Sequence, residues 1–285
     1  MLNYLLYRCG QFIALHLPKK CVYGFAVFCS DLHYLFAFKD HRAVRENLEV
    51  IFPNKPAREL QRIRLEMSRN FAKYLADFFR FEILDRAYID KYLRLDGIRY
   101  FDEALTQKKG VVVLTAHLGN WELGGAVAAL LGYPLWAVVL EHKDKRVNAF
   151  FNYQRQSKGM KVIPLGKAVR KCLEVFRNNE MVALVGDRDF TEKGVVIDFF
   201  GKLAHLPEGP AAFAVKTGAV IVPAFTLRNA DDTFTLKVEK PIEFTPCGDQ
   251  NKDILNLITL YKKILEDYIR KYPEQWYMFR RFWIK

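Results

Sequence analysis

A histidine and a glutamate stand five residues apart in the segment VVVLTAHLGNWELGG, residues 111–125. His117 follows an apolar run directly, and Gly119 and Asn120 behind it favour a loop. If Gly119 and Asn120 open a helix, Glu122 lies in its first turn, and its carboxylate can reach back to the imidazole of His117. A carboxylate on one ring nitrogen fixes the tautomer and leaves the other nitrogen able to act as a base.

This pair has no nucleophile of its own. Thr115 carries the nearest hydroxyl, and nothing in the sequence activates it. The proton that His117 takes is therefore expected to come from a hydroxyl group of the substrate, which suggests acyl transfer to an alcohol. The oxyanion formed in such a reaction needs donors, such as backbone N–H groups near Gly119 or the helix start. The bland alternative is a strand-end histidine that meets an acid by chance.

Short β-rich runs alternate with helical stretches from residue 111 onward. We predict strands at 111–117, 134–140, 161–165, 181–187 and 219–225, and helices near 121–131, 145–157, 167–178 and 207–217. This alternation is typical of an α/β fold with a mainly parallel central sheet flanked by helices. Ligands bind beyond the carboxyl ends of such strands, where both His117 and Asp187 stand.

The remaining segments are predicted from their own patterns. Residues 233–244 alternate like an edge strand or hairpin, and a last helix is expected over 252–271. Apolar residues recur at helical spacing over 57–79, after a basic helix that prolines stop. We predict a membrane-associating helical region over 1–85 and an α/β catalytic domain over 86–285, joined in one globular unit.

The composition narrows the partners. The chain has 285 residues, and its hydrophobic content of 51% excludes a disordered protein. Its net charge of +12 favours a partner of negative charge. Nucleic acid is not expected, because the basic residues are spread along the chain without a recognised motif. The five cysteines are scattered without a C-x-x-C pair, which fits a reducing compartment and argues against a zinc site. No metal site is predicted.

Two apolar runs stand near the N-terminus, at residues 1–17 and 21–38. Arg8 interrupts the first, and Asp31 and His33 interrupt the second. A membrane span needs about 20 nearly uncharged residues, so we expect buried or interfacial helices. A single N-terminal anchor is the alternative. No cleavage site of a signal peptide follows.

Five segments, in order, resemble the blocks of a known family. HLGNWE resembles the H-x-x-x-x-[DE] block of the glycerolipid acyltransferase superfamily, in the form used by the lipid A biosynthesis acyltransferase family. RAVRENLEVIFP resembles the N-terminal signature of that family, and GDRDFTEKGVVIDFFG its central block. LPEGPAAFAVKTGAVIVPAF and YPEQWYMFRRFW resemble its P-E-G and C-terminal blocks. The resemblance covers nearly the whole chain and implies a glycerol-3-phosphate acyltransferase-like fold.

The resemblance also implies roles for residues. His117 would be the general base, oriented by Glu122 or by Glu192, which occupies the position used in related mannoside acyltransferases. Arg188 would bind a phosphate or sugar of the acceptor. The other residues predicted to bind substrate are Asp187, Asp189, Glu208, Gly209 and Asn120. Capping and an ion pair with Arg188 would account equally well for the two aspartates.

One residue departs from the family pattern. Pro210 stands where the glycerol-phosphate branch often has Thr or Ser, which argues against a glycerol phosphate acceptor. The leading hypothesis is an O-acyltransferase that moves a fatty acyl group from an acyl thioester to a hydroxyl of a glycolipid resembling a lipid A precursor. The donor would be acyl carrier protein or acyl-CoA. No cofactor is expected, because the thioester is a co-substrate.

The enzyme would work at the cytoplasmic face of a bacterial inner membrane, where it would bind anionic membrane lipids. Three alternatives stay open. The first is a phosphatidylinositol mannoside-type or other lipid acyltransferase of the same family. The second is a metal-dependent glycosyltransferase that uses the D-R-D sequence at residues 187–189 to hold a divalent cation. The third is a membrane-binding protein without enzymatic activity.

Overall fold

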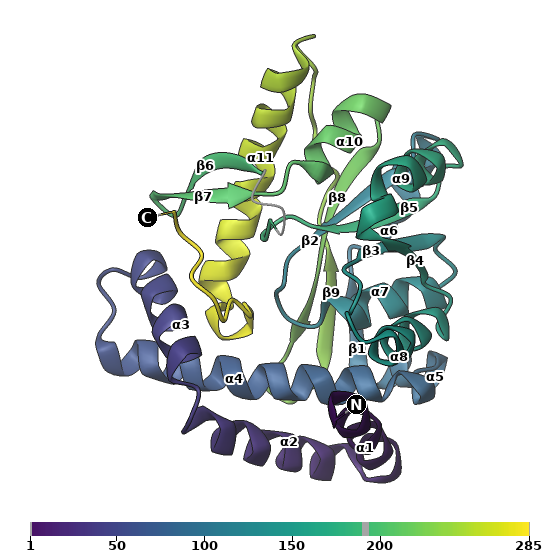
Figure 1. Cartoon of the computed structure of the whole chain (residues 1–285). Helices are drawn as coiled ribbons and strands as arrows, with labels where there is room; N and C mark the ends of the chain where they lie inside the picture. The colour runs from purple at the N-terminus through teal and green to yellow at the C-terminus, as the bar shows by residue number, and fades with distance from the viewer. Residues whose placement is uncertain (1, 190–193, 285) are drawn as a thin grey trace.

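The apolar run at residues 111–115 forms β2 (Val111–Thr115), the middle strand of a seven-stranded sheet (Figure 1). The computed structural model describes residues 2–189 and 194–284, and its strand order is β1-β9-β8-β2-β5-β3-β4. Five strands run parallel to one another, and the edge pair β1 and β9 runs the opposite way. The other strands are β1 (Leu93–Asp96), β3 (Leu135–Val139), β4 (Lys161–Pro164), β5 (Met181–Val185), β8 (Val220–Arg228) and β9 (Phe234–Val238).

Helices cover both faces of the sheet, because the side chains of β2 alternate between two apolar layers. Val112 and Leu114 join the layer of α9, α10 and α11. Val111 and Val113 join the layer of α6, α7 and α8. These helices are α6 (Arg99–Thr106), α7 (Trp121–Leu130), α8 (Lys145–Gln156), α9 (Ala168–Arg177), α10 (Gly209–Thr217) and α11 (Gln250–Lys271). The predicted α/β fold with a mainly parallel sheet is confirmed.

Several short elements were not predicted from the sequence, among them α6, β1 and a hairpin. β1 has only four residues, LRLD, which are too few for a clear pattern. A separate antiparallel hairpin consists of β6 (Val195–Phe199) and β7 (Lys202–Leu206). Both hairpin strands are partly exposed, which weakens their apolar signal. Residues 233–244 form only β9, since Pro241 lacks the N–H group that a longer ladder would need.

Four helices precede the sheet: α1 (Leu2–His16), α2 (Lys19–Tyr34), α3 (Phe38–Ile51) and α4 (Ala57–Phe79). As predicted, α3 ends just before Pro53 and α4 spans residues 57–79. Figure 1 shows α4 passing across the carboxyl ends of the central strands, with α1 and α2 on its far side. A short helix α5 (Arg86–Tyr92) then leads into β1.

None of the described helices is by itself both long and apolar enough to cross a membrane. α2 and α3 meet that criterion only when taken together, and they are bent by 94° at the break between them.

A buried polar cluster joins the N-terminal helices to the sheet. Asp77 of α4 is 3% exposed, and Arg228 at the end of β8 is 7% exposed. The Asp77 carboxylate accepts hydrogen bonds from Arg228, from the hydroxyl of Tyr23 in α2, and from the side-chain amide of Asn120 at 3.0 Å. Burial disfavours the charge on Arg228, but Asp77 and Tyr23 outweigh it and raise the pKa of Arg228. One carboxylate thus connects α2, α4, β8 and the loop before α7.

Replacing Asp77 with alanine should destabilise the protein strongly. The change leaves the guanidinium of Arg228 buried without its carboxylate, and breaking a buried ion pair in this way lowers the free energy of unfolding by about 3–5 kcal/mol. Urea unfolding followed by circular dichroism measures the difference. The matched control is Asp90→Ala, which removes an exposed pair with Arg86 and should change the stability by about 1 kcal/mol or less. Equal effects of the two changes would contradict the structural role of Asp77.

Candidate active site

His117 and Asp187 meet at the carboxyl edge of the sheet. β2 and β5 are parallel neighbours in which Thr115 pairs with Val185, and the N–H of Gly186 donates to the carbonyl of Thr115 at 2.8 Å. Because the two chains leave the sheet in step, the residues that follow lie side by side. The Nδ1 atom of His117 lies 2.9 Å from Oδ1 of Asp187. The carboxylate that holds the histidine therefore comes from the neighbouring strand.

Asp187 is fully buried and well supplied with hydrogen-bond donors. Its Oδ2 atom accepts from the backbone N–H of His117 at 3.1 Å and from the indole N–H of Trp276 at 3.0 Å. Burial by itself would raise the pKa of Asp187, but the charges of His117 and Arg188 and the hydrogen bonds of His117 and Trp276 lower it overall. An ionised carboxylate only accepts, so Nδ1 of His117 carries the proton and Nε2 carries the lone pair.

The C-terminal segment supports the histidine loop as an added strand. Leu118 forms an antiparallel bridge with Trp276, and the N–H of Tyr277 donates to the carbonyl of His117 at 2.9 Å. The N–H of Gly119 donates to the carbonyl of Gln275, also at 2.9 Å. The N–H of Gly119 is thus engaged in this pairing, and the stabilisation of an oxyanion by backbone N–H groups near Gly119 or at the helix start stays a prediction.

Gly119 is required by the backbone of this loop. Its φ of +63° lies in the left-handed region, and a Cβ atom there would stand 2.1 Å from the carbonyl oxygen of Thr226. The next residue, Asn120, donates from its backbone N–H to the same oxygen at 2.7 Å. The loop thus runs close against the end of β8, and only glycine allows that approach.

The structure gives Glu122 a partner other than His117. Its carboxylate binds Arg155 of α8 through two hydrogen bonds of 2.6 and 2.9 Å, and both side chains are about 90% buried. This corrects the expectation that Glu122 reaches back to the imidazole. The reason is local: Asn120 caps α7 by accepting from the N–H of Leu123, and the helix then directs Glu122 toward α8. The second candidate acid, Glu192, lies outside the described residues.

Asp187 and Asn120 were both predicted to bind substrate, and both side chains are buried. Asp187 is engaged with His117 and Trp276, as described above. Asn120 is 1% exposed, caps α7 and donates to Asp77, so its side chain is part of the scaffold. Their contact with a substrate stays a prediction.

Arg188 and Asp189 hold neighbouring backbone in place. One Nη atom of Arg188 donates to the carbonyl of Tyr277 at 2.9 Å, and burial lowers the pKa of Arg188 although Asp187 opposes this effect. The carboxylate of Asp189 accepts from the N–H of Gly194 at 2.7 Å. The role of Arg188 and Asp189 in binding the acceptor stays a prediction.

Glu208 and Gly209 lie at the start of α10. Gly209 begins the helix, and the exposed Glu208 precedes it. The helix leads into β8, whose Val220 pairs with Val111 at the start of β2. The end of α10 is thus near the amino edge of the sheet. Substrate binding by Glu208 and Gly209 stays a prediction.

Two residues of the site were missed in the sequence. The indole N–H of Trp276 donates to the carboxylate of Asp187, and the backbone N–H of Tyr277 donates to the carbonyl of His117. The quoted C-terminal block contains both, but nothing in its pattern places it against residues far earlier in the chain. The role of Asp187 had a usable signal, because it ends a strand predicted to neighbour that of His117.

A parallel sheet covered on both faces, with a histidine–aspartate pair at its carboxyl edge, defines an α/β enzyme. The chain belongs to the family of bacterial lipid A biosynthesis acyltransferases, which it matches over residues 1–285. It is an O-acyltransferase that acts on lipids. The glycosyltransferase and non-enzymatic hypotheses are therefore not supported.

Named relatives include two kinds of lipid acyltransferase. A phosphatidylinositol mannoside acyltransferase of Mycolicibacterium smegmatis is 27% identical over 98% of this chain and 90% of the relative. A lipid A biosynthesis acyltransferase of Haemophilus influenzae is 22% identical over 84% of this chain and 74% of the relative. A lipid A biosynthesis palmitoleoyltransferase of Escherichia coli is 24% identical over 84% of this chain and 77% of the relative.

Asp187→Asn should reduce the rate of acyl transfer by roughly 10²-fold or more without unfolding the protein. Two N–H donors point at Oδ2, so the asparagine must place its oxygen there and turn its NH₂ group toward Nδ1 of His117. The imidazole then carries its proton on Nε2 and cannot act as a base. Steady-state kinetics measures the loss, and Glu122→Gln is the comparison.

Glu122→Gln should retain most of the activity of the folded enzyme, because Glu122 binds Arg155 and leaves the tautomer of His117 unchanged. If Glu122→Gln lowers kcat as much as Asp187→Asn while both proteins remain folded, the assignment of Asp187 as the orienting acid is wrong.

Proposed function

We propose that this protein transfers a fatty acyl group from an acyl thioester to a hydroxyl group of a glycolipid, with His117 as the general base. The observation that carries the proposal is the contact between His117 and the buried Asp187. The side chain of His117 remains 14% exposed while that of its partner is fully buried, so solvent reaches the imidazole and not the carboxylate.

The reaction then follows from the tautomer. Nε2 of His117 takes the proton of the acceptor hydroxyl as the hydroxyl oxygen attacks the thioester carbonyl carbon. The new C–O bond forms, and the carbonyl electron pair moves to oxygen to give a tetrahedral oxyanion. When the carbonyl re-forms, the C–S bond breaks and the leaving thiolate takes the proton from the imidazolium. The products are an ester and a thiol, and Asp187 stabilises the transient charge on His117.

A sugar-bearing lipid is the acceptor that the relatives support. These relatives are phosphatidylinositol mannoside and lipid A biosynthesis acyltransferases. We propose a glycolipid of one of these two kinds, a lipid A precursor being the first candidate and a mannosylated phosphatidylinositol the alternative. Arg188 would contact its phosphate or sugar, because a planar guanidinium can donate two parallel hydrogen bonds to one such group.

The acyl donor is proposed to be acyl carrier protein or acyl-CoA. Both are anionic, and the net charge of +12 favours their approach. The thioester already carries the acyl group in an activated form, so we expect the reaction to need no further cofactor.

The N-terminal helices supply a surface suited to a membrane. Ten of the 21 exposed large hydrophobic side chains among the described residues lie within residues 5–38, and we call this set the N-terminal apolar surface. Its members are Leu5, Leu6, Phe12, Leu17, Phe25, Phe28, Leu32, Leu35, Phe36 and Phe38. The exposed Lys20, Lys39 and Arg42 stand beside them and would attract anionic lipid. We propose that this surface attaches the enzyme to the cytoplasmic face of the inner membrane.

His117→Ala should abolish acyl transfer in the cell. A general base contributes on the order of 10²–10⁴-fold to the rate, and in the part of the chain that the structure describes Asp187 positions no other group that could replace it. Mass spectrometry of lipids from cells without the gene, complemented with wild-type or variant protein, identifies the lipid that gains an acyl chain. Purified enzymes then give the rates. A folded His117→Ala variant with activity within about threefold of wild type would contradict the mechanism.

Phe28→Glu should weaken binding to phosphatidylglycerol vesicles at low salt by about tenfold or more. It removes an aromatic ring that the bilayer would bury, and it adds a charge of the same sign as the lipid. Co-sedimentation measures the binding. The control is Val169→Glu on α9, since Val169 is 66% exposed and Phe28 65%, but Val169 lies outside the N-terminal apolar surface. Equal binding by both variants would locate the attachment elsewhere.

A further inference from the structure

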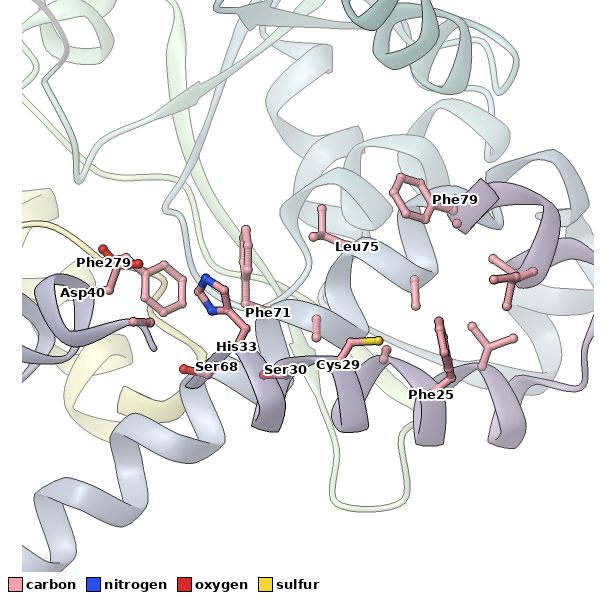
Figure 2. A pocket seen from close by; sticks show the side chains of 18 of the residues that line it. Phe25, Cys29, Ser30, His33, Asp40, Ser68, Phe71, Leu75, Phe79 and Phe279 are labelled. Carbon is pink, nitrogen blue, oxygen red and sulfur yellow. The ribbon is translucent and has the colours of Figure 1, made fainter. Parts of the chain in front are cut away.

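A cavity of about 430 Å³ lies between α2 and α4 (Figure 2). Its volume falls within the range of about 300–1,000 Å³ that is usual for ligand sites. Phe25 and Cys29 line it from α2, and Phe71, Leu75 and Phe79 line it from α4. The cavity is therefore a candidate binding site.

The cavity is elongated along one face of α2. Its lining residues on that helix recur every three or four positions from Val22 to His33, which corresponds to about 16 Å at 1.5 Å per residue. Gly10 and Ile13 of α1 line the same space, as does Ala14. A long space with apolar walls fits an alkyl chain better than a compact ring system.

The two ends of the cavity differ in polarity. In Figure 2 the apolar Phe25 and Phe79 lie toward one end, and His33, Asp40 and Ser68 lie toward the other. Arg64 and His41 also line the cavity. The guanidinium of Arg64 donates to the hydroxyl of Tyr34 at 2.8 Å and to the carbonyl of His41 at 3.3 Å. An alkyl chain would therefore lie with its polar head at the end that holds the charged and polar side chains.

The polar end is connected to the catalytic histidine by a series of aromatic rings. Phe71 lies beside this end and packs on Tyr277, with ring centroids 5.3 Å apart. Tyr277 lies 6.0 Å from Trp121, and Trp121 lies 5.1 Å from His117. The head group of a bound lipid would thus lie on the side of the cavity that faces the active site.

The cavity is also continuous with the N-terminal apolar surface. Phe25 lines the cavity and is 49% exposed, and Cys29 is an exposed residue that lines it as well. A chain can therefore enter from a bilayer that contacts α2. We infer that this cavity holds one alkyl chain of the membrane-embedded acceptor lipid, with the head group directed toward His117. This inference rests on the proposed function, because it assigns the substrate of that reaction.

Cys29→Trp tests the inference by filling the cavity with a side chain that has room to enter. Vesicles made from the lipids of cells lacking the gene supply the acceptor, and palmitoyl-CoA supplies the acyl group. The vesicle concentration for half-maximal transfer should rise by about tenfold or more, since excluding even a few methylene groups from an apolar site has that effect. Hydrolysis of palmitoyl-CoA without vesicles should be unchanged, as should co-sedimentation with the vesicles.

Two further variants make the test specific. Cys21→Trp is the control, because Cys21 is an exposed cysteine of the same helix that lies outside the cavity lining. It should behave like wild type in all three measurements. Ala72→Phe, which enters the cavity from α4, should reproduce the effect of Cys29→Trp.

Several outcomes would overturn the inference. If Cys29→Trp slows hydrolysis as much as transfer, the cavity holds the donor chain. If it reduces co-sedimentation as much as transfer, the cavity holds a bulk membrane lipid. If Cys29→Trp and Ala72→Phe both match Cys21→Trp, the cavity has no part in acceptor binding. Failure of the wild-type enzyme to hydrolyse or to transfer the acyl group of both palmitoyl-CoA and palmitoyl-acyl carrier protein would overturn the proposed function itself, and the inference with it.

Discussion

The burial of the Asp187 carboxylate determines how the edge of the sheet at His117 is assembled. A charged group without solvent must be surrounded by donors, and Asp187 obtains them from three places: the imidazole and the backbone of His117, and the indole of Trp276. Each donor belongs to a different part of the chain from Asp187 itself. The carboxylate therefore fixes β5, the loop after β2 and the C-terminal segment in one arrangement, and the protonation of the imidazole follows from it.

A second buried carboxylate does the same for the scaffold around the site. Asp77 accepts hydrogen bonds from α2, from β8 and from Asn120, which caps the helix behind His117. The helices proposed to meet the membrane are thus connected through polar contacts to the loop that carries the base. Removing water from both carboxylates makes these contacts directional, because each donor must stay in place to offset the lost hydration.

Much of the fold could be predicted because its signals are local. The buried runs of β2 and β5, the loop glycine at 119 and the periodic apolar residues of α4 each specify their own element. The position of His117 at a strand end followed from the same patterns. The partners of charged groups could not be predicted in this way. Glu122 and Asp187 both stand near a strand end or helix start at the edge of the sheet that carries His117. The orientation of α7 directs Glu122 to Arg155 of α8, and Asp187 is the carboxylate that contacts His117. The support from Trp276 depends on a contact between distant segments.

The pairing of residues 117–119 with 275–277 has a consequence for the order in which the protein is made. More than half of the chain's length separates these two short segments. During translation the histidine loop leaves the ribosome long before the strand that supports it, whereas α1 and α2 emerge earlier still. If residues 5–38 bind the membrane as proposed, the nascent chain can reach the bilayer before Trp276 has been made, and attachment then precedes completion of the hydrogen bonds around Asp187.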